Sequence, residues 1–285
     1  MLRQRVLTAV VGIPLGLVLV CLGGWYLAGV LALVAVGGLR EYYRLMAARG
    51  IGVYAWLGYP LAVMLMGVVA GSPRGQEGGQ ALALEGVLLA AAMAVGGAWV
   101  LSKSMRPRPG SRLLATLVGH LYVPQLLSYA LRLRMLDAPA VQLRGTEVIA
   151  PVGLCWVIAL LLVIWGLDTA AYAVGKTLGK HKLCPAISPG KTVEGALGAL
   201  LAAVILTAGL GYWLGLPVGY GVVLGGLLGV VGQAGDLFES MLKRRVGVKD
   251  SGALLPGHGG VLDRFDSLLF AAPVAYFYLA VLVRW

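Results

Sequence analysis

Long apolar runs recur along the whole chain, and short segments that carry most of the charge separate them. A helix needs roughly 20 mostly apolar residues to cross the hydrocarbon core of a bilayer, and by this criterion the pattern predicts about nine membrane-spanning helices. The predicted spans are residues 6–23, 25–40, 53–71, 81–102, 113–131, 148–173, 193–214, 217–235 and 266–284. The pattern therefore predicts an all-α polytopic membrane protein.

The composition agrees with this prediction. Hydrophobic residues make up 59% of the 285 residues, the chain contains 43 glycines, and the mean hydropathy is +0.87. A water-soluble fold could not cover so much apolar sequence, so a soluble domain is disfavoured. The three cysteines, Cys21, Cys155 and Cys184, are scattered and have no CxxC spacing, so they predict neither a disulfide framework nor a zinc site.

The charge distribution predicts the orientation of the chain. Its net charge of +11 comes from basic residues that lie between apolar runs, so we expect a lipid bilayer as partner and no nucleic acid. Arginines and lysines gather before the first span and after the second and fourth spans, which places these segments in the cytoplasm. Three arginines after the fifth span depart from this rule: Arg132, Arg134 and Arg144.

The first apolar run is expected to be retained as a span, because it is long, has no small-x-small cleavage site and is followed directly by another apolar run. If all nine helices cross, residues 176–191 and 235–267 both face the cytoplasm and the C-terminus lies outside. The two segments that are richest in charge then share one compartment, and we expect a polar site there.

The stretch from Gly235 to Ser267 holds five of the twelve carboxylates of the chain, beside five basic residues. The carboxylates are Asp236, Glu239, Asp250, Asp263 and Asp266, and the basic residues are Lys243, Arg244, Arg245, Lys249 and Arg264. Ionisable groups near a bilayer are costly to bury and tend to face a cavity, a partner or an ion. This density of charge therefore indicates a functional site.

Spacing within this stretch favours particular groupings. If the eighth helix continues past the membrane surface, Asp236, Glu239, Ser240 and Lys243 share one face of it. Asp263 and Asp266, at i and i+3, begin the last helix, where they would either cap it or supply oxygen ligands to a hard divalent cation such as Mg²⁺. The turn Gly257-His258-Gly259-Gly260 would let backbone amides approach an anion, whereas a lone histidine is more often structural.

A third constellation runs from Asp168 to Gly195 and contains a lysine-rich segment with no acidic residue between Asp168 and Glu194. Its lysines, Lys176, Lys180, Lys182 and Lys191, could hold phosphate oxygens, although positive-inside topology alone would also explain them. The sequence Gly190-Lys191-Thr192 lacks the upstream glycine of a phosphate-binding P-loop, because position 185 is Pro185, so we reject that motif.

Several of these motifs resemble the phosphatidate cytidylyltransferases, also called CDP-diacylglycerol synthases. The similar residues are Ser240-x-x-Lys243-Arg244, Lys249-Asp250, Gly252, Leu255-Pro256, His258-Gly259-Gly260-x-x-Asp263-Arg264-x-Asp266, Gly235-Asp236, Asp168-x-x-Ala-Tyr172, Ser188-Pro189-x-Lys191-Thr192-x-Glu194-Gly195 and, more loosely, RVLTAVVGIPL and Glu41-Tyr42. Gly190, Val193, Arg245 and Ala253 depart from the family pattern, so no role is assigned to these four positions. The sharp motifs lie after about residue 165.

The resemblance implies transfer of a cytidylyl group from CTP to phosphatidate with Mg²⁺ as the cofactor. Whether a second cation takes part is left open. It implies catalytic roles for Asp236, Asp263, Lys249 and Asp168, and metal binding by Asp236 and Asp263 with Asp266 and Glu239 as further candidates. Substrate binding is expected from Ser188, Lys191, Lys243, Arg244, His258, Gly259, Gly260 and Arg264.

The functional division expected from the sequence is an N-terminal transmembrane region, 1–145, and a C-terminal transmembrane catalytic region, 146–285. The resemblance further implies a multi-pass protein of the cell inner membrane whose active site faces the cytoplasm, and a homodimer is left open. Two alternatives were weighed: a CDP-alcohol phosphotransferase, whose DGxxAR pattern is absent from the sequence, and an ion-coupled secondary transporter, for which no internal repeat is visible.

Overall fold

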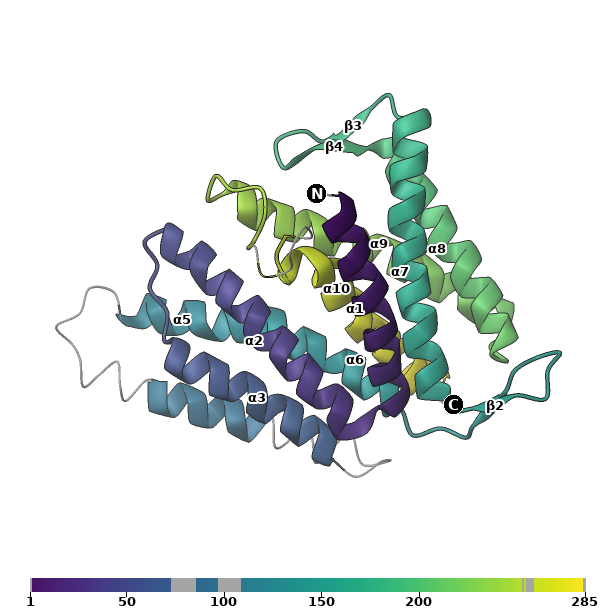
Figure 1. Ribbon diagram of the computed structural model, residues 1–285, viewed down its shortest axis with the longest axis horizontal. Helices are drawn as coiled ribbons and strands as arrows, with labels where there is room; N and C mark the ends of the chain where they lie inside the picture. Colours follow the sequence, from purple (N-terminus) through teal and green to yellow (C-terminus); the bar gives the residue numbers. More distant parts are fainter. Residues whose placement is uncertain (1, 73–85, 97–108, 253, 255–258, 284–285) are drawn as a thin grey trace. The chain divides into compact units, whose positions relative to one another are not determined.

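The computed structural model describes residues 2–72, 86–96, 109–252, 254 and 259–283, and over these residues the secondary structure consists of helices joined by loops and of two short hairpins (Figure 1). The helices are α1 (Leu2–Leu22), α2 (Gly24–Ala48), α3 (Ala55–Gly71), an unlabelled helix (Gly86–Gly96), α5 (Pro109–His120), the π-helical turn η1 (Leu121–Gln125), α6 (Leu126–Arg134), α7 (Val152–Thr177), α8 (Val193–Trp213), α9 (Val218–Arg244), α10 (Leu262–Phe277) and the π-helical turn η2 (Tyr278–Val283). A helix therefore occurs in each of the predicted spans, which confirms the all-α prediction.

Within the described ranges, five helices are long and apolar enough to cross a membrane: Gly110–Arg134, Val152–Thr177, Val193–Trp213, Val218–Arg244 and Leu262–Val283. Shorter apolar helices occupy Val10–Leu22, Ala55–Gly71 and Gly86–Gly96. On α8, Leu197, Leu201 and Ile205 lie at i, i+4 and i+8 and are each 61% exposed. Such an exposed apolar stripe suits contact with lipid tails, and the chain is a multi-pass membrane protein.

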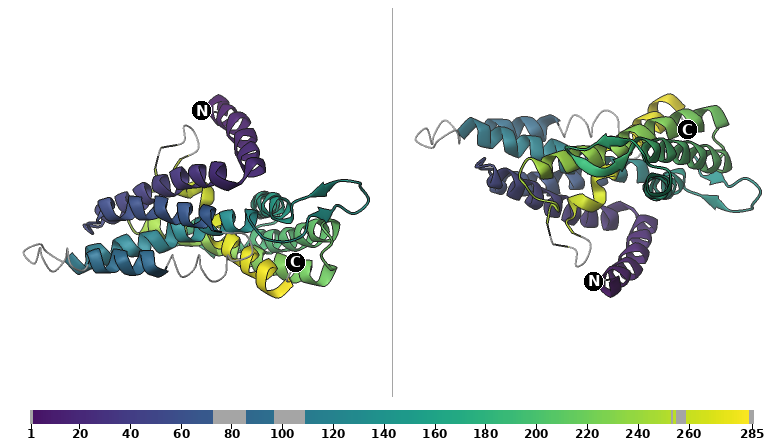
Figure 2. Two further views of the ribbon diagram at one scale, coloured as in Figure 1. Left: turned by 90° about the horizontal axis from the view of Figure 1, so that it is seen from below. Right: turned by 90° about the horizontal axis from the view of Figure 1, so that it is seen from above.

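The start of α7 differs from the predicted span 148–173. Residues Ile149–Ala150 form strand β2, which pairs antiparallel with β1 (Val141–Gln142), and the helix begins at Val152. The reason is Pro151, which occupies the position before the helix with φ of −59° and has no N–H to donate. The β1–β2 hairpin extends beyond this end of α7 (Figure 2).

The chain divides into two compact units. Unit 1 comprises Met1–Arg132 and Val246–Arg264, and unit 2 comprises Leu133–Arg245 and Phe265–Trp285. In unit 1, α2 packs against α3 and η1, and the chain bends sharply between α1 and α2 at Gly23 (Figure 2). In unit 2, α8 packs against both α7 and α9, and the second hairpin, β3 (Lys182–Cys184) with β4 (Ser188–Thr192), contacts the same three helices.

Candidate functional site

The predicted site residues fall into two groups that belong to different units. Unit 2 contains Asp168 on α7, Ser188 and Lys191 on β4, Asp236, Glu239, Lys243 and Arg244 on α9, and Asp266 on α10. Unit 1 contains Lys249 in the loop after α9, Gly259 and Gly260 before α10, and Asp263 and Arg264 in the first turn of α10. His258 lies outside the described residues.

Helix α9 continues without a break from Val218 to Arg244, which confirms the predicted extension of the eighth helix through its charged end. Lys243 Nζ donates to Glu239 Oε2 over 2.8 Å, one helical turn apart. Glu239 is fully buried and Lys243 is 8% exposed. Buried charges need a partner at close range, so this ion pair fixes the position of the Lys243 ammonium group on the helix.

The end of α9 also holds the β3–β4 hairpin at two places. Lys191 Nζ, on β4, lies 2.6 Å from Asp236 Oδ2, and both side chains are partly exposed. Arg244 Nε donates to the backbone carbonyl oxygen of Ile187 over 3.1 Å. Lys191 and Asp236 were predicted separately, as a phosphate ligand and a metal ligand, and in the structure they form an ion pair with each other.

A carboxylate at the start of α8 orders the base of the hairpin. Glu194 accepts hydrogen bonds from the backbone N–H groups of Lys180 and His181, and His181 Nδ1 lies 2.6 Å from Glu194 Oε1. Thr192 caps α8, since its hydroxyl oxygen accepts from the N–H of Gly195 over 3.1 Å. These contacts hold the strand that carries Ser188 and Lys191 against the helical part of unit 2.

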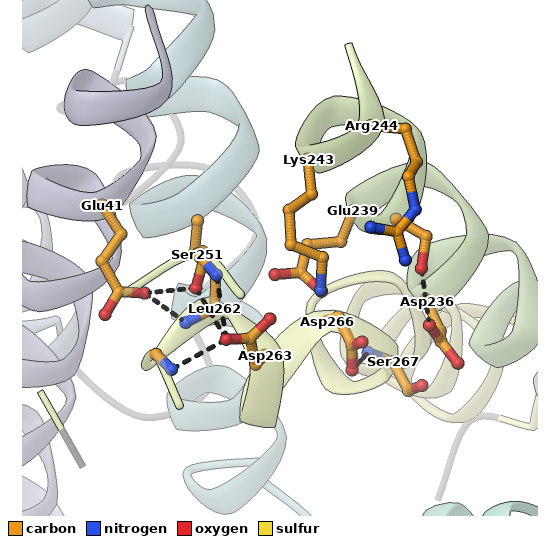
Figure 3. A network of polar contacts seen from close by, with 12 residues as sticks. Glu41, Asp236, Glu239, Lys243, Arg244, Ser251, Leu262, Asp263, Asp266 and Ser267 are labelled. Atoms are coloured by element: carbon orange, nitrogen blue, oxygen red, sulfur yellow. Dashed lines mark hydrogen bonds and ion pairs between the residues drawn. The ribbon is translucent and has the colours of Figure 1, made fainter. Parts of the chain in front are cut away.

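Helices α9 and α10 approach each other closely at Gly235. A Cβ atom built on Gly235 would lie 2.5 Å from the backbone carbonyl oxygen of Asp266 and 2.9 Å from Phe270 Cδ2, so only glycine fits. The approach brings Asp266 within electrostatic range of Asp236, Asp168 and Lys243. Asp266 Oδ1 accepts from the N–H of Ser267 over 2.6 Å (Figure 3). We call Asp168, Asp236 and Asp266 the acidic cluster; it draws one carboxylate from each of α7, α9 and α10.

The acidic cluster fits a divalent cation by its donor chemistry. Carboxylate oxygens are the ligands that Mg²⁺ prefers, and the ion usually takes one or two of them together with water and substrate phosphates. Within the described part of the chain, no three histidine, cysteine, aspartate or glutamate side chains converge closely enough to form a metal site by themselves. The Lys191 ammonium group already stands beside Asp236, so this carboxylate faces a cationic group.

In unit 1, the loop before α10 is held by two carboxylates (Figure 3). Asp263 Oδ2 accepts from the N–H of Ser251 over 3.0 Å, from the Ser251 hydroxyl over 3.1 Å and from the N–H of Gly260 over 2.7 Å. Glu41, on α2, accepts from the same Ser251 hydroxyl over 2.8 Å and from the N–H groups of Val261 and Leu262 over 2.9 Å each. Both carboxylates therefore accept from the Ser251 hydroxyl and from backbone N–H groups next to the start of α10.

Glu41 and Ser251 were not among the predicted site residues. Glu41 entered the sequence analysis only through a loose resemblance, and Ser251 lies next to Asp250 without any motif of its own. Their contact joins positions 210 residues apart, and no local spacing reports such a pair. The one signal available was an acidic residue near the end of an apolar span, where charge is costly unless it has partners.

Comparison with known proteins identifies the family. The sequence pattern of the cytidylyltransferase family matches residues 3–282. A phosphatidate cytidylyltransferase from a Synechocystis species is 38% identical over 302 aligned residues, which cover 98% of this chain and 97% of that protein. A protein of the same name from Bacillus subtilis is 52% identical over 131 residues, which cover 45% of this chain and 49% of that protein. Another from Staphylococcus aureus is 48% identical over 124 residues, which cover 43% of this chain and 48% of that protein. The chain belongs to the cytidylyltransferase family.

Proposed function

We propose that this protein is a phosphatidate cytidylyltransferase, an integral-membrane nucleotidyltransferase of phospholipid biosynthesis. It transfers the cytidylyl group of CTP to phosphatidate and releases CDP-diacylglycerol and pyrophosphate. The relative from Synechocystis carries this name and aligns over nearly the whole of both chains. A multi-pass fold suits a reaction in which one substrate is a lipid and the other is a soluble nucleotide.

The observation that carries the proposal is the acidic cluster together with its two lysines. Asp266 lies within electrostatic range of Asp236, Asp168 and Lys243, and Lys191 contacts Asp236 directly. Two polyanions must approach each other in this reaction, so a site needs cationic groups for phosphates as well as carboxylates for a cation. Unit 2 offers both kinds of group toward the C-terminal end of α9.

In the proposed reaction, an oxygen of the lipid phosphate attacks the α-phosphorus of CTP. The bond from the α-phosphorus to the bridging oxygen of the β-phosphate breaks, and pyrophosphate leaves with the electron pair. A phosphate monoester has a second pKa of about 6, so the attacking oxygen is largely ionised near neutral pH. The site therefore needs to align and neutralise the two phosphate groups, and neither a strong general base nor a serine or cysteine nucleophile is required.

A divalent cation, proposed to be Mg²⁺, supplies charge neutralisation for the phosphate oxygens when it is bound. We propose Asp236 as its ligand in unit 2, with Asp266 as a further ligand or as a carboxylate that orients the first, and Asp168 as a third catalytic carboxylate. Asp263, in unit 1, is proposed as a metal ligand on the family motif. Glu239 is proposed to act on Lys243, because its contact in the structure is with that ammonium group.

The basic and glycine residues are proposed to bind phosphate oxygens. Lys191 and Ser188 would do so from β4, a strand that is ordered by the contacts of Glu194 and Thr192. The remaining members of this proposed set are Lys243, Arg244, Lys249, His258, Gly259, Gly260 and Arg264. Gly259 has φ of +83°, the backbone region that favours glycine, so a side chain there would strain the turn before α10.

We propose that the active site faces the cytoplasm, where CTP is found, and that the protein resides in the cell inner membrane. The positive-inside pattern supports this orientation. The proposed division of labour keeps residues 1–145 as a transmembrane region and residues 146–285 as the catalytic region. A homodimer remains a prediction that gel filtration or cross-linking in detergent would test.

Purified protein in detergent, incubated with phosphatidate, Mg²⁺ and CTP labelled at the α-phosphorus, tests the function. The expected result is label in a lipid that co-migrates with CDP-diacylglycerol. CTP labelled at the γ-phosphorus is the matched control, and its label must appear in pyrophosphate and stay out of the lipid. Failure to form cytidylyl lipid across a range of detergents, cation concentrations and pH values would contradict the proposal.

A further inference from the structure

We propose that Glu41 is a positioning residue for the transfer reaction. From α2 it fixes the segment before α10 and, through the hydroxyl group of Ser251, the carboxylate of Asp263. The catalytic part of this inference rests on the proposed function, in which Asp263 takes part. All of the residues concerned belong to unit 1.

The Glu41 carboxylate is fully buried, and its described contacts are with Ser251, Val261 and Leu262. Its Oε1 atom accepts from the N–H of Val261. Its Oε2 atom accepts from the N–H of Leu262 and from the Ser251 hydroxyl (Figure 3). The first N–H groups of a helix have no partner inside the helix, and a negative charge there is favoured by the helix dipole. Glu41 therefore caps α10 from a position 221 residues away in the sequence.

Ser251 links Glu41 to Asp263. Its hydroxyl oxygen lies 2.8 Å from Glu41 Oε2 and 3.1 Å from Asp263 Oδ2, and a hydroxyl group has one hydrogen, which the two carboxylates must share. The N–H groups of Ser251 and Gly260 also donate to Asp263 Oδ2. The orientation of Asp263 thus depends on the same segment that Glu41 holds in place.

The backbone at Gly252 and Gly260 lies so close to Glu41 that neither position has room for a side chain. A Cβ atom built on Gly252 would collide with Glu41 Oε1, and one built on Gly260 would collide with the Ser251 hydroxyl and Glu41 Oε2. The two glycines therefore leave the room that the carboxylate occupies. Since a buried carboxylate is costly without such donors, the segment and Glu41 require each other.

In this arrangement Glu41 does not bind the cation itself but orients Asp263, a proposed metal ligand, through the Ser251 hydroxyl. The segment that it holds contains Gly259 and Gly260 and leads into Asp263, all of which belong to the proposed site. Removing a carboxylate that orients a metal ligand typically costs about 10- to 100-fold in metal affinity or activity. A residue that served only stability would instead lower the amount of folded protein and leave the cation dependence unchanged.

The first test measures hydrogen exchange in the full-length protein in detergent, without nucleotide or divalent cation. Glu41→Gln keeps the size of the side chain but removes the charge that receives three hydrogen bonds. Because each hydrogen bond to a charged group is worth about 1.5 to 3 kcal/mol, exchange in peptides that contain Val261 and Leu262 should speed up roughly 10- to 100-fold. Glu147→Gln, which removes the same charge from an exposed residue, is the control and should leave this exchange unchanged.

The second test measures transfer activity as a function of Mg²⁺ concentration. Glu41→Gln should raise the concentration for half-maximal activity by about tenfold or more, as expected for loss of a group that orients a metal ligand. Ser251→Ala removes only the shared hydroxyl group and keeps the bonds from Glu41 to the backbone. It should therefore raise the Mg²⁺ requirement while exchange at Val261 and Leu262 stays close to that of the wild type.

Unchanged exchange in Glu41→Gln, or an unchanged Mg²⁺ requirement in either variant, would overturn the inference. If Glu41→Gln does not fold, Ser251→Ala decides: a raised requirement supports the link to Asp263, and a wild-type requirement refutes it. If the wild-type protein forms no CDP-diacylglycerol, the proposed function and the catalytic part of this inference fail together. The exchange measurement would still decide whether Glu41 holds the segment, so the two failures are distinguishable.

Discussion

Replacing Gly235 with alanine tests whether the close approach of α9 and α10 keeps Asp266 within electrostatic range of Asp236. The added Cβ atom would lie 2.5 Å from the backbone carbonyl oxygen of Asp266, and that atom cannot rotate away as a side chain could. To reach 3.4 Å, where ordinary van der Waals contact begins, the two helices would have to separate by about 0.9 Å. The clash with Phe270 Cδ2 acts in the same direction, although the ring can adjust.

Two effects of different size should follow. Overpacking of this kind typically costs about 1 to 3 kcal/mol of stability, so the thermal midpoint in detergent should fall while the protein still folds. A displacement of about 1 Å at a reacting centre can cost roughly 10²-fold in rate, so the turnover number for CDP-diacylglycerol formation should fall by about that factor. The loss of activity should therefore exceed anything that the loss of folded protein explains.

Gly226→Ala is the matched control, because it makes the same substitution in the same helix where a Cβ atom would meet nothing within 4 Å. It should keep wild-type turnover and a thermal midpoint at least as high as that of the wild type, since alanine favours a helix more than glycine does. Near-normal turnover in Gly235→Ala, with its thermal midpoint lowered, would refute the link between this helix contact and the geometry of the acidic cluster. Equal losses in both variants would refute it as well.

Three further predictions concern single groups of the proposed site. Asp236→Asn and Asp263→Asn should each abolish turnover while the protein still folds, and near-normal activity in either would remove that residue from the proposed cation ligands. Lys191→Ala should lower kcat/KM for CTP about 10- to 100-fold, the range expected for loss of one charge-assisted contact. The control is Arg144→Ala, which removes a guanidinium group that lies over the Tyr212 ring and should leave kcat/KM unchanged. Equal effects of the two substitutions would argue against a phosphate contact of Lys191. Glu239→Ala should lower stability by roughly 3 to 5 kcal/mol because it leaves Lys243 buried without its close carboxylate, and a thermal midpoint close to that of the wild type would contradict this.

The sequence predicted the helices well because the length of an apolar run is a local property. The runs that became α8 and α9 have the length of a bilayer crossing, and the charged face of α9 follows from the spacing of Asp236, Glu239 and Lys243 alone. The start of α7 was less predictable. Residues 149–150 are apolar enough to continue the span, but they pair with β1, and the helix begins only after Pro151.

The contacts within the candidate site were less accessible to sequence analysis. Lys191 and Asp236 lie in separate motifs, and nothing in their spacing indicates that a hairpin folds back to pair them. Glu41 lies in the expected N-terminal transmembrane region, outside the expected catalytic region, and it acts on the start of the last helix. Such pairings depend on tertiary structure, because helices far apart in the sequence bring these groups together.

The claim that the lipid phosphate attacks CTP is tested most directly by following ¹⁸O from phosphatidate into the products. Phosphatidate labelled with ¹⁸O in the free oxygens of its phosphate group is incubated with CTP, Mg²⁺ and the purified protein, and the ¹⁸O content of both products is measured by mass spectrometry. If the lipid phosphate attacks the α-phosphorus of CTP, all of the label remains in CDP-diacylglycerol and the pyrophosphate contains none. Loss of a labelled oxygen from the lipid, labelled pyrophosphate, or the absence of any cytidylyl lipid would contradict the account.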